Sequence, residues 1–158
     1  MKKTAFYYHN YDTKYGEITI VSNGKAIVKI GRDIKILPTY TKQKDALTDD
    51  MAKQLNEYFR GLRDKFDISF NYVGTEFQIK VWTALYNIPY GETRTYKQIA
   101  EFIGSPKAYR AVGMACNKNP LWIVIPCHRV VGSSGSLTGY AGGLDMKEKL
   151  LELEKVDS

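Results

Sequence analysis

The residues best suited to chemistry are Cys127 and His128, which are adjacent in the segment IPCHRVV (125–131). A thiolate is a strong nucleophile, but a thiol with an unperturbed pKa of about 8.5 is only a few per cent ionised at neutral pH. A neighbouring imidazole can take the thiol proton, directly or through a water molecule. Adjacent side chains of an extended chain point apart, so this chemistry requires the backbone to turn at Cys127.

The surroundings of this pair favour a reactive thiol over a buried structural one. A cysteine behind an apolar run such as WIVI (122–125) is ordinarily a small core residue. Pro126, however, cannot donate to a sheet, so we expect a strand to end there and the chain to enter a loop. The segment GSSGSLTGYAGG (132–143) is rich in glycine, which suits a wall where backbone approaches a ligand closely.

An imidazole base needs a group that orients it, and a carboxylate is the usual choice. The last predicted helix carries three candidates, Glu148, Glu152 and Glu154, and spacing does not choose between them. On these residues a cysteine hydrolase with a Cys-His-Glu triad is an alternative, which turnover of a thioester or peptide would support. A zinc site is not expected, because two cysteines and two scattered histidines lack ligand spacing.

Positive charge is concentrated just before the cysteine. The formal net charge is +6 and the sequence pI about 9.2. Between Arg94 and Arg129, six basic residues stand against a single acid, Glu101, so most of the excess charge lies in this segment. The distribution favours a polyanionic partner such as nucleic acid.

Length and composition suit a globular protein of one domain or two small ones, with 158 residues. The start MKKTAFYYHN has no apolar run that would serve as a signal peptide, and no stretch approaches the roughly 18 apolar residues of a membrane helix. Two cysteines do not make a disulfide framework. We therefore expect no membrane association and an intracellular location: cytoplasmic, or nuclear if the source is eukaryotic.

The first third has the pattern of a small sheet followed by a helix. Residues 16–31 contain two β-branched runs around Asn23-Gly24, which predicts a hairpin, and AFYYH (5–9) is a plausible third strand. A helix is expected from about Thr48. Its apolar face would comprise Met51, Leu55, Phe59 and Leu62, with Gly61 near its end. Residues 65–74 predict a strand or an extended linker.

The second half changes to short, capped helices. Two capping-box patterns precede apolar faces, Thr75 with Gln78 and Thr95 with Gln98. Gly104 is expected to end the second of these helices and Ser105 to cap the next, with Pro106 in its first turn. A final helix is expected from about Leu144 to Lys155.

Two of these helices, TYKQIAEFIG and SPKAYRAVGMACNKN, are joined by a Gly-Ser turn and predict a helix-turn-helix. The second is mostly alanine and glycine apart from charged residues, so its backbone can approach another surface closely. Tight packing within its own domain would explain this equally. Lys107 and Arg110 project from the helix, and together with the local charge they favour DNA contact.

With these residues in view, the sequence resembles the methylated-DNA–protein-cysteine methyltransferases, also called O6-alkylguanine-DNA alkyltransferases. The resemblance rests on IPCHRVV, on KNP before it and on GYAGG after it. It extends through GTEFQIKVW, IPYGETRTY, SPKAYRAVG and GGLDMKEKLLELE, from about residue 74 to 154. Residues 1–73 match only in general character.

The resemblance implies an α+β fold in two domains. Residues 1–73 would form a ribonuclease H-like domain, a small antiparallel sheet with a helix. Residues 74–158 would form a mostly helical, winged-helix-like domain that carries the helix-turn-helix and the reactive cysteine.

The implied reaction is a single SN2 transfer. The Cys127 thiolate attacks the O6-alkyl carbon of a damaged guanine, or of O4-alkylthymine, restoring the base and leaving S-alkylcysteine. A thioether is not readily hydrolysed, so each molecule acts once. No cofactor or metal is implied, because the alkyl group comes from the lesion.

By the same resemblance, His128 takes the thiol proton through a water and Glu154 holds His128, a choice that spacing left open. Asn119 fixes the active-site turn. Tyr96 donates a hydrogen bond or proton to the leaving guanine, and Lys147 supports Tyr96 electrostatically.

The resemblance also implies a pocket for the extruded base. Its residues would be the backbone carbonyls of Cys127 and Val130, the wall residue Tyr140, Ala141, and the pocket-side residues Trp122 and Cys116. Some relatives have a serine after the wall tyrosine, whereas Ala141 offers only its backbone N–H.

The implied partner is double-stranded DNA containing O6-alkylguanine, gripped through the minor groove by a monomer. Arg110 matches the residue that enters the base stack where the guanine has left. Lys97, Ser105 and Ser133 match phosphate-contact positions, and Lys107 lies beside them. The alternative in a different class is a non-catalytic lesion sensor; those relatives lack the cysteine, which is present here.

Overall fold

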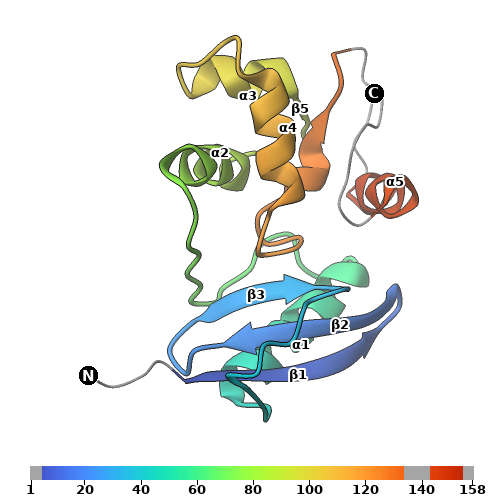
Figure 1. Cartoon of the computed structure of the whole chain (residues 1–158). Helices are drawn as coiled ribbons and strands as arrows, with labels where there is room; N and C mark the ends of the chain where they lie inside the picture. The colour runs from blue at the N-terminus through green and yellow to red at the C-terminus, as the bar shows by residue number, and fades with distance from the viewer. Residues whose placement is uncertain (1–4, 134–142, 155–158) are drawn as a thin grey trace. The chain divides into compact units, whose positions relative to one another are not determined.

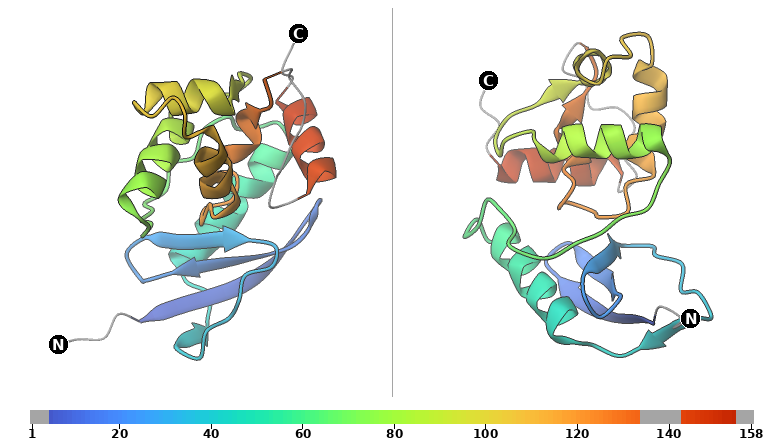
Figure 2. Two further views of the ribbon diagram at one scale, coloured as in Figure 1. Left: turned by 45° about the horizontal axis from the view of Figure 1, so that its top comes forward. Right: turned by 90° about the vertical axis from the view of Figure 1, so that its left-hand side faces the viewer.

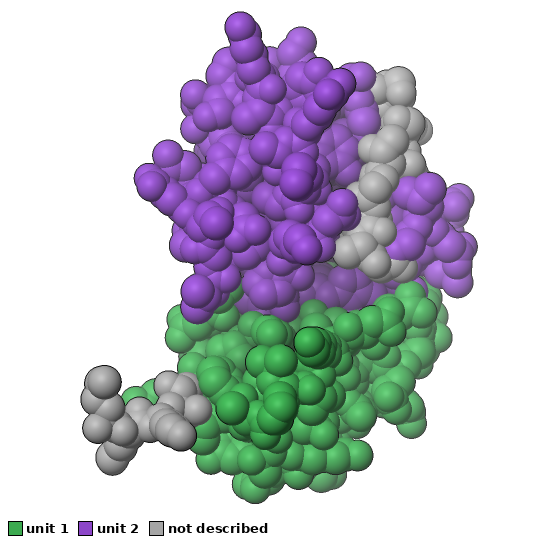
Figure 3. Space-filling view, in the orientation of Figure 1, with its two compact units in different colours: residues 1–72 green, residues 73–158 purple. Residues whose placement is uncertain are grey.

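A computed structural model describes residues 5–133 and 143–154 of the chain. The chain divides into two compact units, Met1–Tyr72 and Val73–Ser158 (Figure 3). Of the predicted site residues, Tyr140 and Ala141 lie outside the described residues.

The first unit is a four-stranded sheet with one helix (Figure 1). Its strands are β1 (Phe6–Thr13), β2 (Gly16–Ser22), β3 (Ile27–Gly31) and β4 (Tyr40–Lys42), in the order β3-β2-β1-β4. β2 pairs antiparallel with β1 and with β3, which confirms the predicted hairpin at Asn23-Gly24. The short β4 joins β1 in parallel, so the sheet is mixed at that edge.

Helix α1 (Ala46–Phe59) lies across one face of this sheet (Figure 2). Asp45 caps it by accepting from the Thr48 backbone N–H. The apolar residues Met51, Leu55 and Phe59 are buried, as predicted. Leu62 is 64% exposed and lies beyond the end of the helix, so its assignment to the buried face was wrong.

The second unit contains four helices with two short strands among its described residues (Figure 1). They are α2 (Glu76–Tyr86), β5 (Arg94–Thr95), α3 (Tyr96–Phe102), α4 (Tyr109–Asn117), β6 (Val130–Val131) and α5 (Leu144–Leu153). Both predicted capping boxes are present, at Thr75 for α2 and Thr95 for α3. The indole N–H of Trp82 on α2 donates to the Ala115 carbonyl of α4 at 2.9 Å, which ties the two helices together.

Helices α3 and α4 are joined by residues 103–108, with Gly104 in the left-handed conformation (φ 81°). Ser105 does not cap α4, contrary to the prediction. Its carbonyl instead accepts from the Ala108 N–H at 2.9 Å, and the helix starts at Tyr109 without a side-chain cap. Ser105 and Pro106 therefore lengthen the turn.

The apolar run before Pro126 does not form the predicted strand. It makes a tight turn in which the Ile125 N–H donates to the Leu121 carbonyl and the Val124 N–H to the Trp122 carbonyl, both at 2.9 Å. Ile123 at its centre has φ 72°, a strained conformation for a β-branched residue. The run is apolar because its side chains are buried, which alone does not distinguish a turn from a strand.

Candidate active site

Cys127 begins a single turn of 3-10 helix, Cys127–Arg129, directly after this tight turn. The backbone thus turns at the cysteine, as the proposed chemistry required. Cys127 is 4% exposed and His128 fully buried. The next residues form β6, which pairs in parallel with β5 and aligns Thr95 with Val131. This pairing brings Tyr96, the first residue of α3, toward the cysteine segment.

Asn119 links the turn to the sulfur. Its side-chain N–H group donates to the Ile125 carbonyl at 2.7 Å and to Cys127 Sγ at 3.2 Å. Its Oδ1 accepts from the Leu121 N–H at 2.9 Å. One amide thus fastens both ends of the strained turn and directs a donor at the sulfur, where it favours the thiolate over the neutral thiol.

His128 is held by a buried carboxylate. Its Nε2 lies 2.7 Å from Glu154 Oε2, and both side chains are fully buried. Burial alone would raise the pKa of Glu154, but hydrogen bonds from His128 and Arg129 outweigh it and lower this pKa to about 2. The carboxylate is therefore ionised and can only accept, so Nε2 of His128 carries a proton.

The other ring nitrogen of His128 has no hydrogen-bond partner among the described residues. Burial lowers the pKa of His128, and Arg129 and Lys147 act in the same direction against the opposing effect of Glu154. The imidazole is accordingly neutral at pH 7, with its Nδ1 lone pair available to accept a proton.

Lys147 and Tyr96 form a second pair near the sulfur. Lys147 Nζ lies 3.4 Å from the Tyr96 hydroxyl, and Lys147 is fully buried. Burial lowers the pKa of Lys147, whereas the negative charge of an ionised Cys127 or Cys116 would raise it. Burial raises the pKa of Cys116, which keeps that second thiol protonated.

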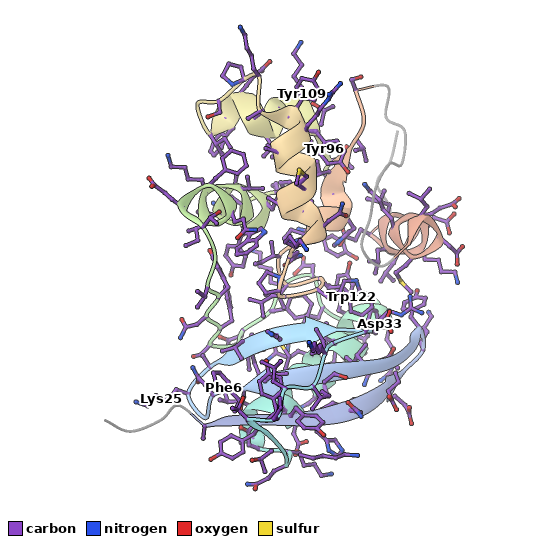
Figure 4. All side chains as sticks on the ribbon, viewed as in Figure 1. Phe6, Lys25, Asp33, Tyr96, Tyr109 and Trp122 are labelled. Carbon is purple, nitrogen blue, oxygen red and sulfur yellow. The ribbon has the colours of Figure 1, made fainter. Side chains whose placement is uncertain are left out.

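Tyr96 also lies against α4. A Cβ placed on Gly113 would sit 3.8 Å from the Tyr96 ring, so the bare face of α4 lets the phenol approach the helix. In Figure 4, Tyr96 is labelled beside α4, and Tyr109 lies at the start of that helix. The small residues of α4 thus serve packing at this point.

The predicted DNA-contact residues lie at the surface of the second unit. Lys97 on α3, Arg110 on α4, Lys107 in the turn and Ser133 are exposed, and Ser105 is half-buried. Met114 lies one helical turn after Arg110 and is 70% exposed, a position that the sequence analysis did not single out.

Of the predicted pocket residues, Trp122 and Val130 are buried.

The sequence analysis missed Arg129 as a candidate site residue, having counted it only among the basic residues of the segment from Arg94 to Arg129. It is buried, and its guanidinium holds Glu154 through Nε to Oε1 at 2.8 Å and through a terminal nitrogen to Oε2 at 2.9 Å. A signal was present in the sequence: an arginine followed by two valines stands in an apolar setting, where a charge requires a partner.

Within residues 5–133 and 143–154, no group of three or more His, Cys, Asp and Glu side chains is placed to hold a metal ion. No helix in the described part of the chain is long and apolar enough to cross a membrane.

The second unit combines a cysteine–histidine–glutamate arrangement with a helix-turn-helix.

Two family descriptions together match nearly the whole chain. Residues 6–72 match the ribonuclease-like domain, and residues 76–156 the DNA binding domain, of 6-O-methylguanine DNA methyltransferase. A methylated-DNA–protein-cysteine methyltransferase of Methanosarcina barkeri is 49% identical, over 94% of this chain and 97% of that protein. The protein of the same name from Mycobacterium tuberculosis is 44% identical, over 94% and 92%.

Among solved structures, Mycobacterium tuberculosis OGT in complex with DNA superposes with a TM-score of 0.89 at 43% identity, covering 94% of this chain and 92% of that one. The α+β fold, with a ribonuclease-like first unit and a mostly helical second unit, is the fold of these proteins. The chain belongs to the 6-O-methylguanine DNA methyltransferase family.

Proposed function

We propose that this chain is a DNA-repair enzyme that transfers the alkyl group of O6-alkylguanine in double-stranded DNA to its own Cys127, once per molecule. The activity is that of its named relatives. The observation that carries the proposal for this chain is the setting of one sulfur. Cys127 Sγ accepts a hydrogen bond from Asn119 and precedes a histidine that a buried, ionised carboxylate holds, and Nδ1 of this histidine has no partner within the described ranges.

The first step is removal of the thiol proton. Nδ1 of His128 accepts it, directly or through a water molecule, and the resulting imidazolium is stabilised by Glu154. Sulfur then bears a negative charge that the Asn119 N–H group and the ammonium of Lys147 offset.

In the second step an S–C bond forms as the bond between the alkyl carbon and O6 breaks, and the electron pair leaves with the guanine. The purine anion takes up a proton, for which the Tyr96 hydroxyl is the proposed donor. Lys147, 3.4 Å from that hydroxyl, stabilises the phenolate that proton donation leaves. The product thioether is stable, so the enzyme is consumed.

The DNA surface is proposed from α3 and α4. Lys97, Ser105, Lys107 and Ser133 would contact phosphates, and Arg110 would fill the space of the extruded base. We further propose that a monomer binds the minor groove and that Tyr140 and Ala141 line the base pocket. An intracellular location, where DNA and free thiols coexist, is part of the proposal.

The decisive experiment is incubation with a duplex that contains one O6-methylguanine, followed by intact-mass and peptide analysis. We expect one methyl group per molecule, located on Cys127. Binding of the lesion without an adduct would indicate a non-catalytic sensor. Repeated turnover of a thioester or peptide would indicate a hydrolase.

A further inference from the structure

Arg129 has no part in the steps proposed above, yet it makes more contacts with the catalytic carboxylate than His128 does. We propose that Arg129 is a positioning residue of the alkyl transfer: it fixes the Glu154 carboxylate so that His128 presents Nδ1 to Cys127. The inference rests on the proposed function of the site.

The orientation argument follows from the geometry of the guanidinium. Two of its nitrogens reach the two oxygens of Glu154 at 2.8 and 2.9 Å, and a third donates to the Ile88 carbonyl at 2.7 Å. A planar fork bonded to both oxygens leaves the carboxylate no freedom to rotate. The ring of Tyr90, 5.6 Å from the guanidinium, supports the fork.

This matters because Glu154 is at the end of its element. It is the residue after the last turn of α5, where helices commonly fray. Arg129 ties that end to the carbonyl of Ile88, just after α2. The imidazole can hold only one carboxylate oxygen, at 2.7 Å, so His128 alone would not prevent rotation about the Glu154 side-chain bonds.

The charge argument concerns the groups that face His128. They are the Glu154 carboxylate at the end of α5, the Lys147 ammonium within α5, and Arg129 and Cys127 in its own turn. Glu154 alone would favour a protonated imidazole, which could not act as a base. Arg129 offsets that carboxylate, while Glu154 remains close enough to stabilise the imidazolium once the thiol proton has moved to Nδ1.

Two substitutions separate these effects. Arg129→Gln removes both the charge and the two-pronged contact. It leaves the buried Glu154 carboxylate without its guanidinium counter-charge, which lowers folding stability. Arg129→Lys keeps the charge but not the two-pronged contact. A matched control is Arg63→Gln, which removes an arginine–glutamate pair of 3.2 Å in the first unit.

The measurement is the single-turnover rate constant with free O6-benzylguanine, per titrated active site, as a function of pH. For Arg129→Gln we expect the acid limb of the profile to move to higher pH, and the rate constant on the plateau to fall about tenfold or more. For Arg129→Lys the limb should keep its wild-type position while the plateau falls. Arg63→Gln should match wild type in both.

If Arg129 only stabilises the fold, its variants will melt at lower temperature and contain fewer active molecules, with an unchanged rate constant and profile in those that remain. That result overturns the proposal. If Arg129→Gln does not fold, a wild-type plateau in Arg129→Lys overturns it instead. A wild-type protein that forms no adduct would reject the proposed function itself, which is a separate outcome.

Discussion

A part-buried polar cluster at the start of α1 and a buried one at the end of α5 differ in whether, among the described residues, every group has a hydrogen-bond partner. In the first unit, the Tyr11 hydroxyl lies 2.9 Å from Thr48 Oγ1 and donates to Asp49 at 2.7 Å, and Ser22 donates to Asp45. Asp45 in turn accepts from the Thr48 N–H and caps α1. Burial raises the pKa of Tyr11, and Asp49 raises it further, so the phenol stays neutral.

In the second unit, the cluster around Glu154 has a basic nitrogen with no partner among the described residues and a sulfur next to it in sequence. Both clusters are made of hydrogen-bonded carboxylates at the start or end of a helix. The first satisfies its groups and so stabilises its unit. The second leaves one acceptor unmatched, at a cost in stability, and that acceptor can do chemistry.

The largest effect on alkyl transfer is expected from Cys127→Ser, in the cluster of the second unit. A serine hydroxyl has a much higher pKa than a thiol and is a poorer nucleophile toward saturated carbon, so alkyl transfer should vanish. Binding of duplex DNA, measured by fluorescence anisotropy, should stay within about twofold of wild type, because the proposed DNA surface lies on α3 and α4. Loss of binding would mean that the sulfur and the DNA surface are not separate.

Arg110→Ala separates the surface of the second unit from its cluster. We expect alkyl transfer from a duplex to slow by about tenfold or more, since the few kcal/mol needed to extrude the base would no longer be offset. The rate with free O6-benzylguanine should change little. Equal slowing with both substrates would show that Arg110 does not assist extrusion.

As the pH falls, the cluster around Glu154 should lose stability first, at His128. The folded-state pKa of His128 lies below its ordinary value, so its contribution to stability is present above about pH 6.5 and is lost as pH falls toward the folded pKa. Glu154, with a pKa of about 2, adds stability that is lost only from about pH 4 downward. Calorimetry between pH 7.5 and 5 should show a falling Tm.

In His128→Gln the fall in Tm over that pH range should be smaller, because the titrating ring is gone. His9→Gln is the control: it removes the other histidine, on β1, and should leave the fall as in wild type. An identical fall in all three proteins would assign the acid sensitivity to other groups.

The smallest effect is expected from Tyr11→Phe in the matched cluster. Removing the hydroxyl breaks its hydrogen bonds to Thr48 and Asp49 and should lower the free energy of unfolding by about 1 kcal/mol. Denaturant titration would measure it, and the alkyl-transfer rate constant should be unchanged. A slower transfer would show that the first unit contributes to the chemistry.

Local signals in the sequence predicted much of the architecture. Capping boxes at Thr75 and Thr95 involve residues three apart, so neighbouring residues suffice to define them. The Asn23-Gly24 hairpin is local in the same way. Predictions that depended on burial were less accurate: Leu62 and the WIVI run are both apolar, yet one is exposed and the other forms a turn.

By itself the sequence determined which chemical groups are available: one thiol beside one imidazole, a segment with excess positive charge, and short helices with their own caps. Only the tertiary structure decided which groups meet. Glu154 reaches His128 and Arg129 across 26 and 25 residues, and Lys147 reaches Tyr96 across 51. Such pairings follow from how α5, the cysteine turn and α3 pack, because the side chains of a helix converge on a distant partner only when the backbone between them is folded.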